Sequence, residues 1–182
     1  MRIGTDISSQ KAASLLSTGE IIAYPTEGVW GLGCDPKNTE AIKKLINLKK
    51  RDPSKGLILV GSEINHFKEY VDVEKYGESM MEKWPGPHTW IVPCKPISEL
   101  ITGSSTSVAL RLSNHKTIKE ITKKHQGAII STSANTEGHL AAKSKEEVRS
   151  YFKDVFMVKG SLGDLATSTP IQELVSRNWI RM

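Results

Sequence analysis

The sequence predicts an α/β fold in a single domain, built on a sheet of mixed strand direction. Helical and strand-like segments alternate along most of the 182 residues, which is typical of a sheet flanked by helices. No helix separates the strands predicted near residues 89 and 107, so we expect part of the sheet to be antiparallel. The length suits one domain and no linker divides it, so residues 1–182 are expected to form one unit.

The first two predicted elements are a helix and a strand. Ser8 or Ser9 can cap the helix, because a serine hydroxyl accepts a hydrogen bond from a free amide of the first turn. Alanines and leucines share one face of this segment, and Gly19 ends it. A strand follows over residues 20–24 and ends at Pro25.

A turn, a second helix and a buried strand come next. Residues 31–36, GLGCDP, are predicted to form a glycine-rich turn. Asn38 or Thr39 can cap a helix whose apolar residues again share one face. After Gly56, the continuous apolar run over 57–60 is typical of a strand buried on both faces.

The rest of the chain continues this alternation. The predicted elements are helices over 63–70 and 74–84, strands over 89–92 and 107–112, a helix over 115–125, a strand over 127–130, a helix over 144–152 and a strand over 154–158. The final segments are a short strand or helix over 171–175 and a strand over 179–181.

The composition excludes several classes of protein. With 38% hydrophobic and 25% charged residues, the chain is neither disordered nor fibrous. Its 25 Lys and Arg against 20 Asp and Glu give a net charge of +5, which suits anionic partners. The chain lacks an apolar run of ~18 residues and a signal-peptide pattern, and its two cysteines suit a reducing compartment. We therefore expect a cytoplasmic protein with no membrane association.

Familiar cofactor motifs are absent. The GLGCDP segment has Pro36 where a dinucleotide fingerprint needs its third glycine, and no P-loop pattern occurs. The five histidines lack zinc-site spacing, so no protein-held metal is expected. Cys34 is either a reactive thiol or, more simply, a small core residue.

The first candidate cluster stands where the 20–24 strand ends. Tyr24 offers a phenol-bearing wall and Thr26 a hydroxyl, and the glycines that follow let backbone approach a ligand closely. Ligand crevices in open α/β sheets form at strand ends. The alternative is a tight corner that needs proline and glycine for geometry alone.

The second cluster contains four cations within residues 49–55. Lys49, Arg51 and Lys55 stand around Pro53 in a short loop before a buried strand. A planar guanidinium and flexible ammonium groups together suit a polyphosphate. The alternative is that these cations only complement the C-terminal dipole of the preceding helix.

The third cluster follows the strand predicted over 127–130. Ser131, Thr132, Ser133 and Asn135 supply hydroxyls and an amide that can bind phosphate or ribose oxygens, or can simply cap a helix. Arg111, at the end of another strand, is either a carboxylate clamp or a surface arginine.

Hydroxyls and cations gather at these strand ends without a carboxylate pair or a histidine base. This combination suits electrostatic positioning of an anionic ligand. Lys116, Lys119 and Lys123 form a basic stripe on the 115–125 helix, which is either a solvated face or a contact for RNA backbone. The alternative function is therefore a non-catalytic module that binds double-stranded RNA or tRNA.

Five motifs together carry a resemblance to a known family. They are Tyr24-Pro-Thr-Glu27 with GLGCDP after it, Lys49-x-Arg51 with Lys55, Pro85-Gly-Pro-x-Thr89, Val108-Ala-Leu-Arg111 and Ser131-Thr-Ser-Ala-Asn135. From about residue 5 to its end the chain resembles the YrdC/TsaC family of threonylcarbamoyl-AMP synthases, in the short bacterial form. That resemblance implies a twisted, open mixed sheet with flanking helices and a basic concave face.

The resemblance also implies a nucleotidyltransferase reaction. L-threonine, bicarbonate and ATP would give L-threonylcarbamoyladenylate and pyrophosphate, with Mg²⁺ carried on the ATP phosphates. A separate tRNA threonylcarbamoyl-transferase complex would then modify adenosine 37 of tRNAs that read ANN codons.

Site residues are implied position by position. Lys49, Arg51, Ser133 and Asn135 match the signature tetrad at the nucleotide and phosphates. The substrate-binding positions that accompany the tetrad are Tyr24, Thr26, Lys55, Arg111, Ser131 and Thr132. One segment departs from the family: Ser168-Thr-Pro-Ile-Gln-Glu173 stands near a Ser-Thr-Ile-Val-Asp-like stretch, which leaves the roles of Ser168 and Thr169 open.

Overall fold

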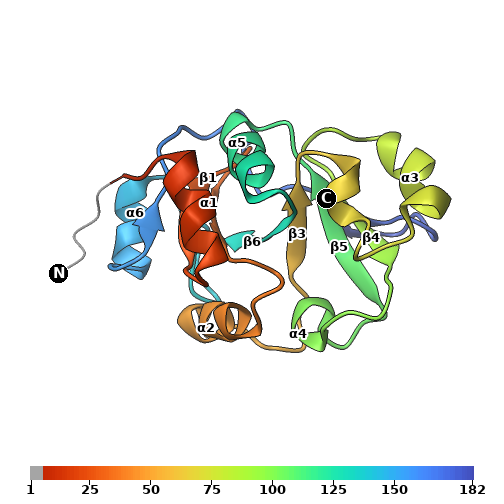
Figure 1. Cartoon of the computed structure of the whole chain (residues 1–182), viewed down its shortest axis with the longest axis horizontal. Helices are drawn as coiled ribbons and strands as arrows, with labels where there is room; N and C mark the ends of the chain where they lie inside the picture. The colour runs from red at the N-terminus through yellow and green to blue at the C-terminus, as the bar shows by residue number, and fades with distance from the viewer. Residues whose placement is uncertain (1–5) are drawn as a thin grey trace.

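The computed structural model describes residues 6–182 and contains one nine-stranded sheet with helices on both faces (Figure 1). The helices are α1 Ser9–Ser17, α2 Thr39–Lys49, α3 Val73–Met81, α4 Glu99–Thr102, α5 Lys116–His125 and α6 Lys145–Tyr151, with a 3-10 helix at Ile64–Phe67. The strands are β1 Ile22–Pro25, β2 Trp30–Gly33, β3 Ile58–Gly61, β4 Thr89–Pro93, β5 Ser107–Leu112, β6 Ile129–Ser133, β7 Phe156–Met157, β8 Ile171–Glu173 and β9 Trp179–Arg181.

The strand order is β7-β1-β2-β6-β3-β5-β4-β8-β9, with both parallel and antiparallel neighbours. The pair β4 and β5 is antiparallel as predicted, although the premise that no helix lies between them is wrong, because α4 does. Strand β6 lies between β2 and β3 and is antiparallel to both. The α/β class and the mixed sheet are therefore confirmed.

Two hydrophobic clusters cover opposite faces of this sheet. Along β1, Ile22 belongs to one cluster and Ala23 to the other, and Ile129 and Ile130 of β6 divide in the same way. Because successive side chains of a strand point to opposite faces, the two clusters must lie on opposite sides. Helices α1 and α5, which lie side by side in Figure 1, cover one face, and α2 contributes to the other.

The glycine-rich turn predicted over 31–36 is wrong for residues 31–33, because strand β2 occupies Trp30–Gly33. Glycine lowers strand propensity, but here it is required by packing. A Cβ on Gly33 would lie 2.4 Å from the carbonyl oxygen of Ile130 and 2.9 Å from the ring of Tyr24. The ring of Tyr24 therefore lies across β2 and takes the space that side chains would fill.

The helix predicted over 63–70 is also wrong in extent, since only Ile64–Phe67 is helical, as a 3-10 turn. Val71 forms an isolated antiparallel bridge with Cys94, so the chain is already extended there and a helix cannot continue.

The short helix α4 was not predicted. It follows Ser98, whose hydroxyl accepts a hydrogen bond from the Leu100 amide. The strand predicted over 154–158 is shorter in the structure, since β7 covers only Phe156–Met157; it pairs with β1, and the amide of Ile7 donates to the carbonyl oxygen of Met157 on its other side.

Other predictions are confirmed within a few residues. Ser8 and Asn38 cap α1 and α2, and their side chains accept hydrogen bonds from amides of the first turn. Cys34 is completely buried, and burial raises the pKa of its thiol to about 12, as expected of a core residue. Within residues 6–182, no helix is both long and apolar enough to cross a bilayer.

Candidate functional site

A cavity of about 290 Å³ opens on the sheet between its two halves. Its walls come from β2 and β6 on one side and from β3, β4 and β5 on the other. Six of the predicted site residues line it: Thr26, Arg51, Arg111, Ser131, Thr132 and Ser133. The remaining four, Tyr24, Lys49, Lys55 and Asn135, are not on its wall.

The strand β6 carries the hydroxyl cluster into the cavity. The prediction that the strand stops at residue 130 is wrong, because Thr132 pairs with Leu32 and Ser133 with Gly31 of β2. The hydroxyls therefore stand on rigid sheet rather than on a loop. A group fixed by two neighbouring strands is better positioned for a ligand than one on a free loop.

Lys49 is placed behind the cavity and not in it. This last residue of α2 is only 3% exposed, and its Nζ donates to the carbonyl oxygens of Ser133 and, at 2.6 Å, Asn135. Burial, and then the nearby Arg51 charge, lower the pKa of Lys49 to about 8. Lys49 thus fixes the end of β6 from behind.

The side chains of Ser133 and Asn135 also bind each other. The Ser133 hydroxyl donates to Oδ1 of Asn135 at 2.6 Å, and Nδ2 of Asn135 donates to the carbonyl oxygens of Thr136 and His139. Asn135 therefore holds both Ser133 and the loop that follows. Only Ser133 reaches the cavity.

Arg51 and Lys55 occupy the loop after α2 but differ in placement. Arg51 lines the cavity, and its Nη2 donates to the carbonyl oxygen of Gly56 at 2.7 Å. Burial lowers the pKa of its guanidinium from the usual value. Lys55 is exposed and forms an ion pair with Glu137, away from the cavity wall.

Of the first predicted cluster, Thr26 reaches the cavity and Tyr24 does not. Tyr24 is completely buried, its hydroxyl lies 3.4 Å from the carbonyl oxygen of Ile130, and burial raises its pKa. The structure does not place it on the cavity wall. Thr26 reaches the wall, and its hydroxyl donates to the carbonyl oxygen of Val29 at 2.7 Å, which holds the turn between β1 and β2.

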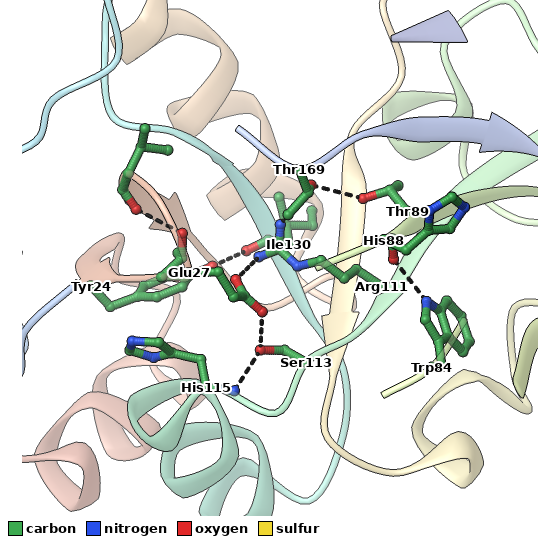
Figure 2. Close-up of polar contacts among 12 residues, drawn as sticks. Tyr24, Glu27, Trp84, His88, Thr89, Arg111, Ser113, His115, Ile130 and Thr169 are labelled. Carbon is green, nitrogen blue, oxygen red and sulfur yellow. Dashed lines mark hydrogen bonds and ion pairs between the residues drawn. The ribbon is translucent and has the colours of Figure 1, made fainter. Parts of the chain in front are cut away.

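Arg111 points from β5 into a polar network that Figure 2 shows. Its Nη1 donates to the hydroxyl of Thr169 at 3.1 Å, and its Nη2 lies 3.4 Å from a carboxylate oxygen of Glu27. The other Glu27 oxygen accepts a hydrogen bond from the Ser113 hydroxyl at 2.6 Å. The side chain of Arg111 is 6% exposed, so this is a buried guanidinium with a carboxylate counter-ion.

The segment 159–170 passes beside the turn between β1 and β2. The amides of Gly163 and Leu165 donate to the carbonyl oxygens of Thr26 and Glu27, and Thr167 to Thr169 line the cavity. A Cβ on Gly28 would lie 2.1 Å from the carbonyl oxygen of Thr167, so only glycine allows this approach. This segment supplies a wall that connects β7 at one sheet edge to β8 near the other.

Sequence reasoning missed Arg181, which also lines the cavity from β9. Its Nε and Nη2 donate to the carbonyl oxygen of Thr169 at 3.1 and 2.5 Å. Burial and the charge of Arg111 lower its pKa. A signal existed in the sequence, since Arg181 is a lone cation in the predicted 179–181 strand.

The cavity combines three guanidinium groups with strand-borne hydroxyls and apolar side chains such as Ile58 and Ile91. Within residues 6–182, no three His, Cys, Asp or Glu side chains are placed to hold a metal ion together. Arginines bind phosphate and carboxylate oxygens through two parallel hydrogen bonds. The arrangement can therefore hold a ligand that carries several negative charges together with an apolar part.

A family model and individual relatives of this chain all belong to the same family. The family model Sua5_yciO_yrdC, described as Telomere recombination, matches residues 14–180. The chain is 44% identical over 170 residues to a threonylcarbamoyl-AMP synthase of Pseudoalteromonas atlantica, covering 90% of each chain. It is 43% identical to that of Saccharophagus degradans, covering 91% of this chain and 90% of the relative.

Among solved structures, the fold is similar to P. abyssi Sua5 complexed with L-threonine. The TM-score is 0.84 at 23% sequence identity, and the match covers 95% of this chain and 53% of that one. At this identity the likeness concerns the fold alone, and it agrees with the sheet described above.

Proposed function

Because the chain belongs to the Sua5_yciO_yrdC family, we propose that it is a threonylcarbamoyl-AMP synthase. In this proposal it joins L-threonine, bicarbonate and ATP to form L-threonylcarbamoyladenylate and pyrophosphate. The names of its relatives at 44% and 43% identity support this activity. The observation in the structure that carries it is the cavity lined by Arg51, Arg111 and Arg181.

The proposed chemistry needs positioning more than acid–base catalysis. The amine of threonine combines with bicarbonate to give a carbamate and water, and a carbamate oxygen then attacks the α-phosphorus of ATP. The bond from the α-phosphorus to the bridging oxygen breaks, and pyrophosphate leaves with the electron pair. Both reactants are anions, so their repulsion must be offset before they can approach in line.

The cavity residues suit this task. We assign Arg51 and Ser133, which both line the cavity, to the ATP phosphates, and Lys49 and Asn135 to holding the end of β6 in place. Guanidinium groups fixed before the reaction stabilise developing charge without reorganisation. Mg²⁺ carried on the phosphates would add further charge neutralisation, since hard oxygen ligands are what it prefers.

Threonine is assigned to the part of the cavity around Arg111. A guanidinium can hold the α-carboxylate through two hydrogen bonds. The apolar side chains of Ile58 and Ile91 lie on the same cavity wall, where they can contact the methyl group of threonine. Of the remaining predicted positions, Thr26, Ser131 and Thr132 line the cavity, whereas Tyr24 and Lys55 act on it only indirectly in this proposal.

In the cell, the proposed product would be used by a tRNA threonylcarbamoyl-transferase complex at adenosine 37 of ANN-reading tRNAs, in the cytoplasm. The alternative, a non-catalytic RNA-binding module, would use the basic stripe of α5. Its Lys116 and Lys123 are exposed while Ile118 and Ile121 are buried. That surface is independent of the cavity, so the two functions are separable by mutation.

The test is pyrophosphate release by the purified protein. We expect release only when ATP, L-threonine, bicarbonate and Mg²⁺ are all present, with a product of the mass of threonylcarbamoyladenylate. Leaving out any one substrate should reduce release to background. Release that does not depend on threonine, or none at all, would contradict the synthase and favour the RNA-binding module.

Matched variants connect the activity to the cavity. Arg51→Ala should reduce product formation by about 100-fold or more, as removal of a preorganised charged group in an active site does. Lys119→Ala should leave the rate within twofold, because Lys119 lies on α5 and donates to Asn114. Far-UV circular dichroism should be native in both, and wild-type turnover by Arg51→Ala would refute the assignment.

A further inference from the structure

The buried guanidinium of Arg111 is held between two elements that are distant in sequence. Glu27 lies in the turn after β1, and Thr169 lies in the segment before β8. In Figure 2 the Arg111 side chain extends from β5 toward both of them, with Thr89 in contact with the Thr169 hydroxyl at 3.1 Å. We call Glu27, Thr89, Arg111, Ser113 and Thr169 the Arg111 network.

Glu27 is itself held in one orientation. Ser113 is 1% exposed, and its hydroxyl donates to Oε1 of Glu27 at 2.6 Å. The same Ser113 oxygen accepts a hydrogen bond from the His115 amide at 3.1 Å. The only proton of this hydroxyl is therefore committed to Glu27, and the backbone fixes the hydroxyl in turn.

Glu27 also stands outside the cavity wall, whereas Arg111 is part of it. The carboxylate therefore contacts the guanidinium from behind. Because Glu27 does not line the cavity, the geometry does not support a role for it as a base toward the substrate. A carboxylate behind a ligand-binding side chain is the arrangement that orients such side chains in metal sites.

Arg111 keeps unused hydrogen-bonding capacity. Within residues 6–182, its Nε and Nη2 are buried and have no hydrogen-bond acceptor, although Nη2 faces Glu27 as an ion pair. A buried donor without an acceptor is costly, so the Glu27 carboxylate, which faces Nη2 at 3.4 Å, favours the present orientation of the guanidinium. The orientation of the Arg111 guanidinium then decides where in the cavity a substrate carboxylate can bind.

We propose that Glu27 is a positioning residue that sets the orientation of Arg111 for the α-carboxylate of the amino-acid substrate. This inference rests on the proposed function, in which Arg111 binds that carboxylate. Glu27 provides the charge that keeps the guanidinium from turning away, and Ser113 keeps Glu27 in place. Neither residue touches the substrate.

The first experiment measures the dissociation constants of L-threonine and of MgATP by calorimetry. Glu27→Gln keeps the size of the side chain but removes its charge, and we expect threonine affinity to fall about tenfold, as for outer-shell partners of metal ligands. MgATP affinity should stay within twofold. Ser113→Ala, which leaves the Glu27 charge intact, should weaken threonine binding in the same direction.

The matched control is Glu63→Gln, which removes an exposed carboxylate that pairs with Lys123 at 3.8 Å. It should change neither affinity. A purely structural defect in Glu27→Gln would lower the two affinities together, and this outcome would overturn the proposal. Unchanged or tighter threonine binding by Glu27→Gln would overturn it as well.

A double-mutant cycle tests whether Glu27 acts through Arg111. Product formation at threonine concentrations far below KM gives kcat/KM for threonine even in weak variants. Glu27→Gln should lower kcat/KM about tenfold in the wild-type background and by less than twofold in Arg111→Ala. An equal loss in both backgrounds would overturn the inference.

The proposed function and this inference fail in different ways. If the unaltered protein neither binds threonine nor forms the adenylate, both are overturned. If the unaltered protein is active and Glu27→Gln behaves like Glu63→Gln, only the inference is overturned.

Discussion

Lys49 and Arg51 are two residues apart, yet the structure gives them different tasks. Arg51 lines the cavity, while Lys49 is buried behind it and donates to the carbonyl oxygens of Ser133 and Asn135. The loop turns between them at Lys50, which has a left-handed backbone with φ of 53°. In this short cationic segment, Arg51 therefore faces the cavity, whereas Lys49 stabilises the protein around it.

The lowered pKa of Lys49 predicts a pH dependence of ATP binding. Its pKa falls from 10.5 to about 8 because burial disfavours the charged ammonium. Above pH 8 the folded protein loses this charge, and a neutral amine holds the Ser133 and Asn135 carbonyls less strongly. MgATP affinity should therefore weaken severalfold between pH 7.0 and pH 9.5, measured by calorimetry.

The lowered pKa of Lys49 acts in the opposite direction on stability: the free energy of unfolding rises with pH, whereas MgATP affinity falls. Between pH 8 and 10.5 the unfolded chain keeps the Lys49 proton and the folded chain releases it, so the contribution of this group to the free energy of unfolding rises with pH. Urea unfolding at each pH separates this effect from binding. Lys49→Met should lose the pH dependence of MgATP affinity, and an affinity of wild type that stays constant up to pH 9.5 would contradict the prediction.

At the level of elements, β2 and β6 differ most from expectation. The glycines of β2 weigh against strand formation, and the hydroxyl residues at the end of β6 are also typical of a helix cap. Their strand conformation depends on long-range partners, because Gly31 pairs with Ser133 and Leu32 with Thr132. The local sequence pattern does not indicate such long-range partners. It is sufficient to predict α2, β3 and β5.

Gly33→Ala tests this packing requirement. The new Cβ would lie 2.4 Å from the Ile130 carbonyl oxygen and 2.9 Å from the Tyr24 ring. We expect the free energy of unfolding to fall by about 2 kcal/mol or more, as for overpacked cores. Urea denaturation followed by circular dichroism measures the change.

The matched control is Gly77→Ala in the middle of α3. There the nearest atom would be Cγ1 of Val73 at 3.6 Å, an ordinary contact. Alanine should stabilise this helix by roughly 0.5–1 kcal/mol, because glycine loses more backbone entropy on folding. If both substitutions changed the free energy of unfolding in the same direction, packing against Tyr24 would not explain the glycine in β2.

The sequence predicts which residues line the site better than it predicts the contacts that hold them in place. Hydroxyls and cations near strand ends identify Arg51, Arg111 and Ser133, all of which reach the cavity. Glu27 escapes the pattern because it acts through partners far along the chain, Ser113 and Arg111. Such pairs depend on the path of the chain across the sheet, which periodicity does not encode.

At the scale of the whole molecule, the cavity takes residues from both halves of the sheet. Thr26 and Ser131 come from one side, Ile58 and Arg111 from the other, and Arg181 from the far edge strand. A ligand in this cavity therefore contacts a site that exists only when the complete sheet is formed. Binding and global stability should be linked.

We expect MgATP at 100 times its dissociation constant to raise the free energy of unfolding by about 2.7 kcal/mol, the value for a ligand that binds only the native state. Urea unfolding with and without MgATP measures the shift. A solution of MgCl₂ and NaCl at the same ionic strength is the control. A shift no larger than in that control would show that the nucleotide does not bind the folded chain.

The place of β6 between β2 and β3 has a consequence for how the protein is made. The ribosome delivers β1, β2 and β3 early, but β2 and β3 are not neighbours, and each pairs with β6. The sheet therefore stays in two unconnected parts until residues 129–133 emerge, and contacts between residues so distant in sequence form slowly. The strand that joins the two parts is also the one that carries Ser131 to Ser133. During synthesis, the two parts of the sheet can join only after β6 emerges, and the ligand site is completed later still, when the C-terminal residues add Thr169 and Arg181 to the cavity.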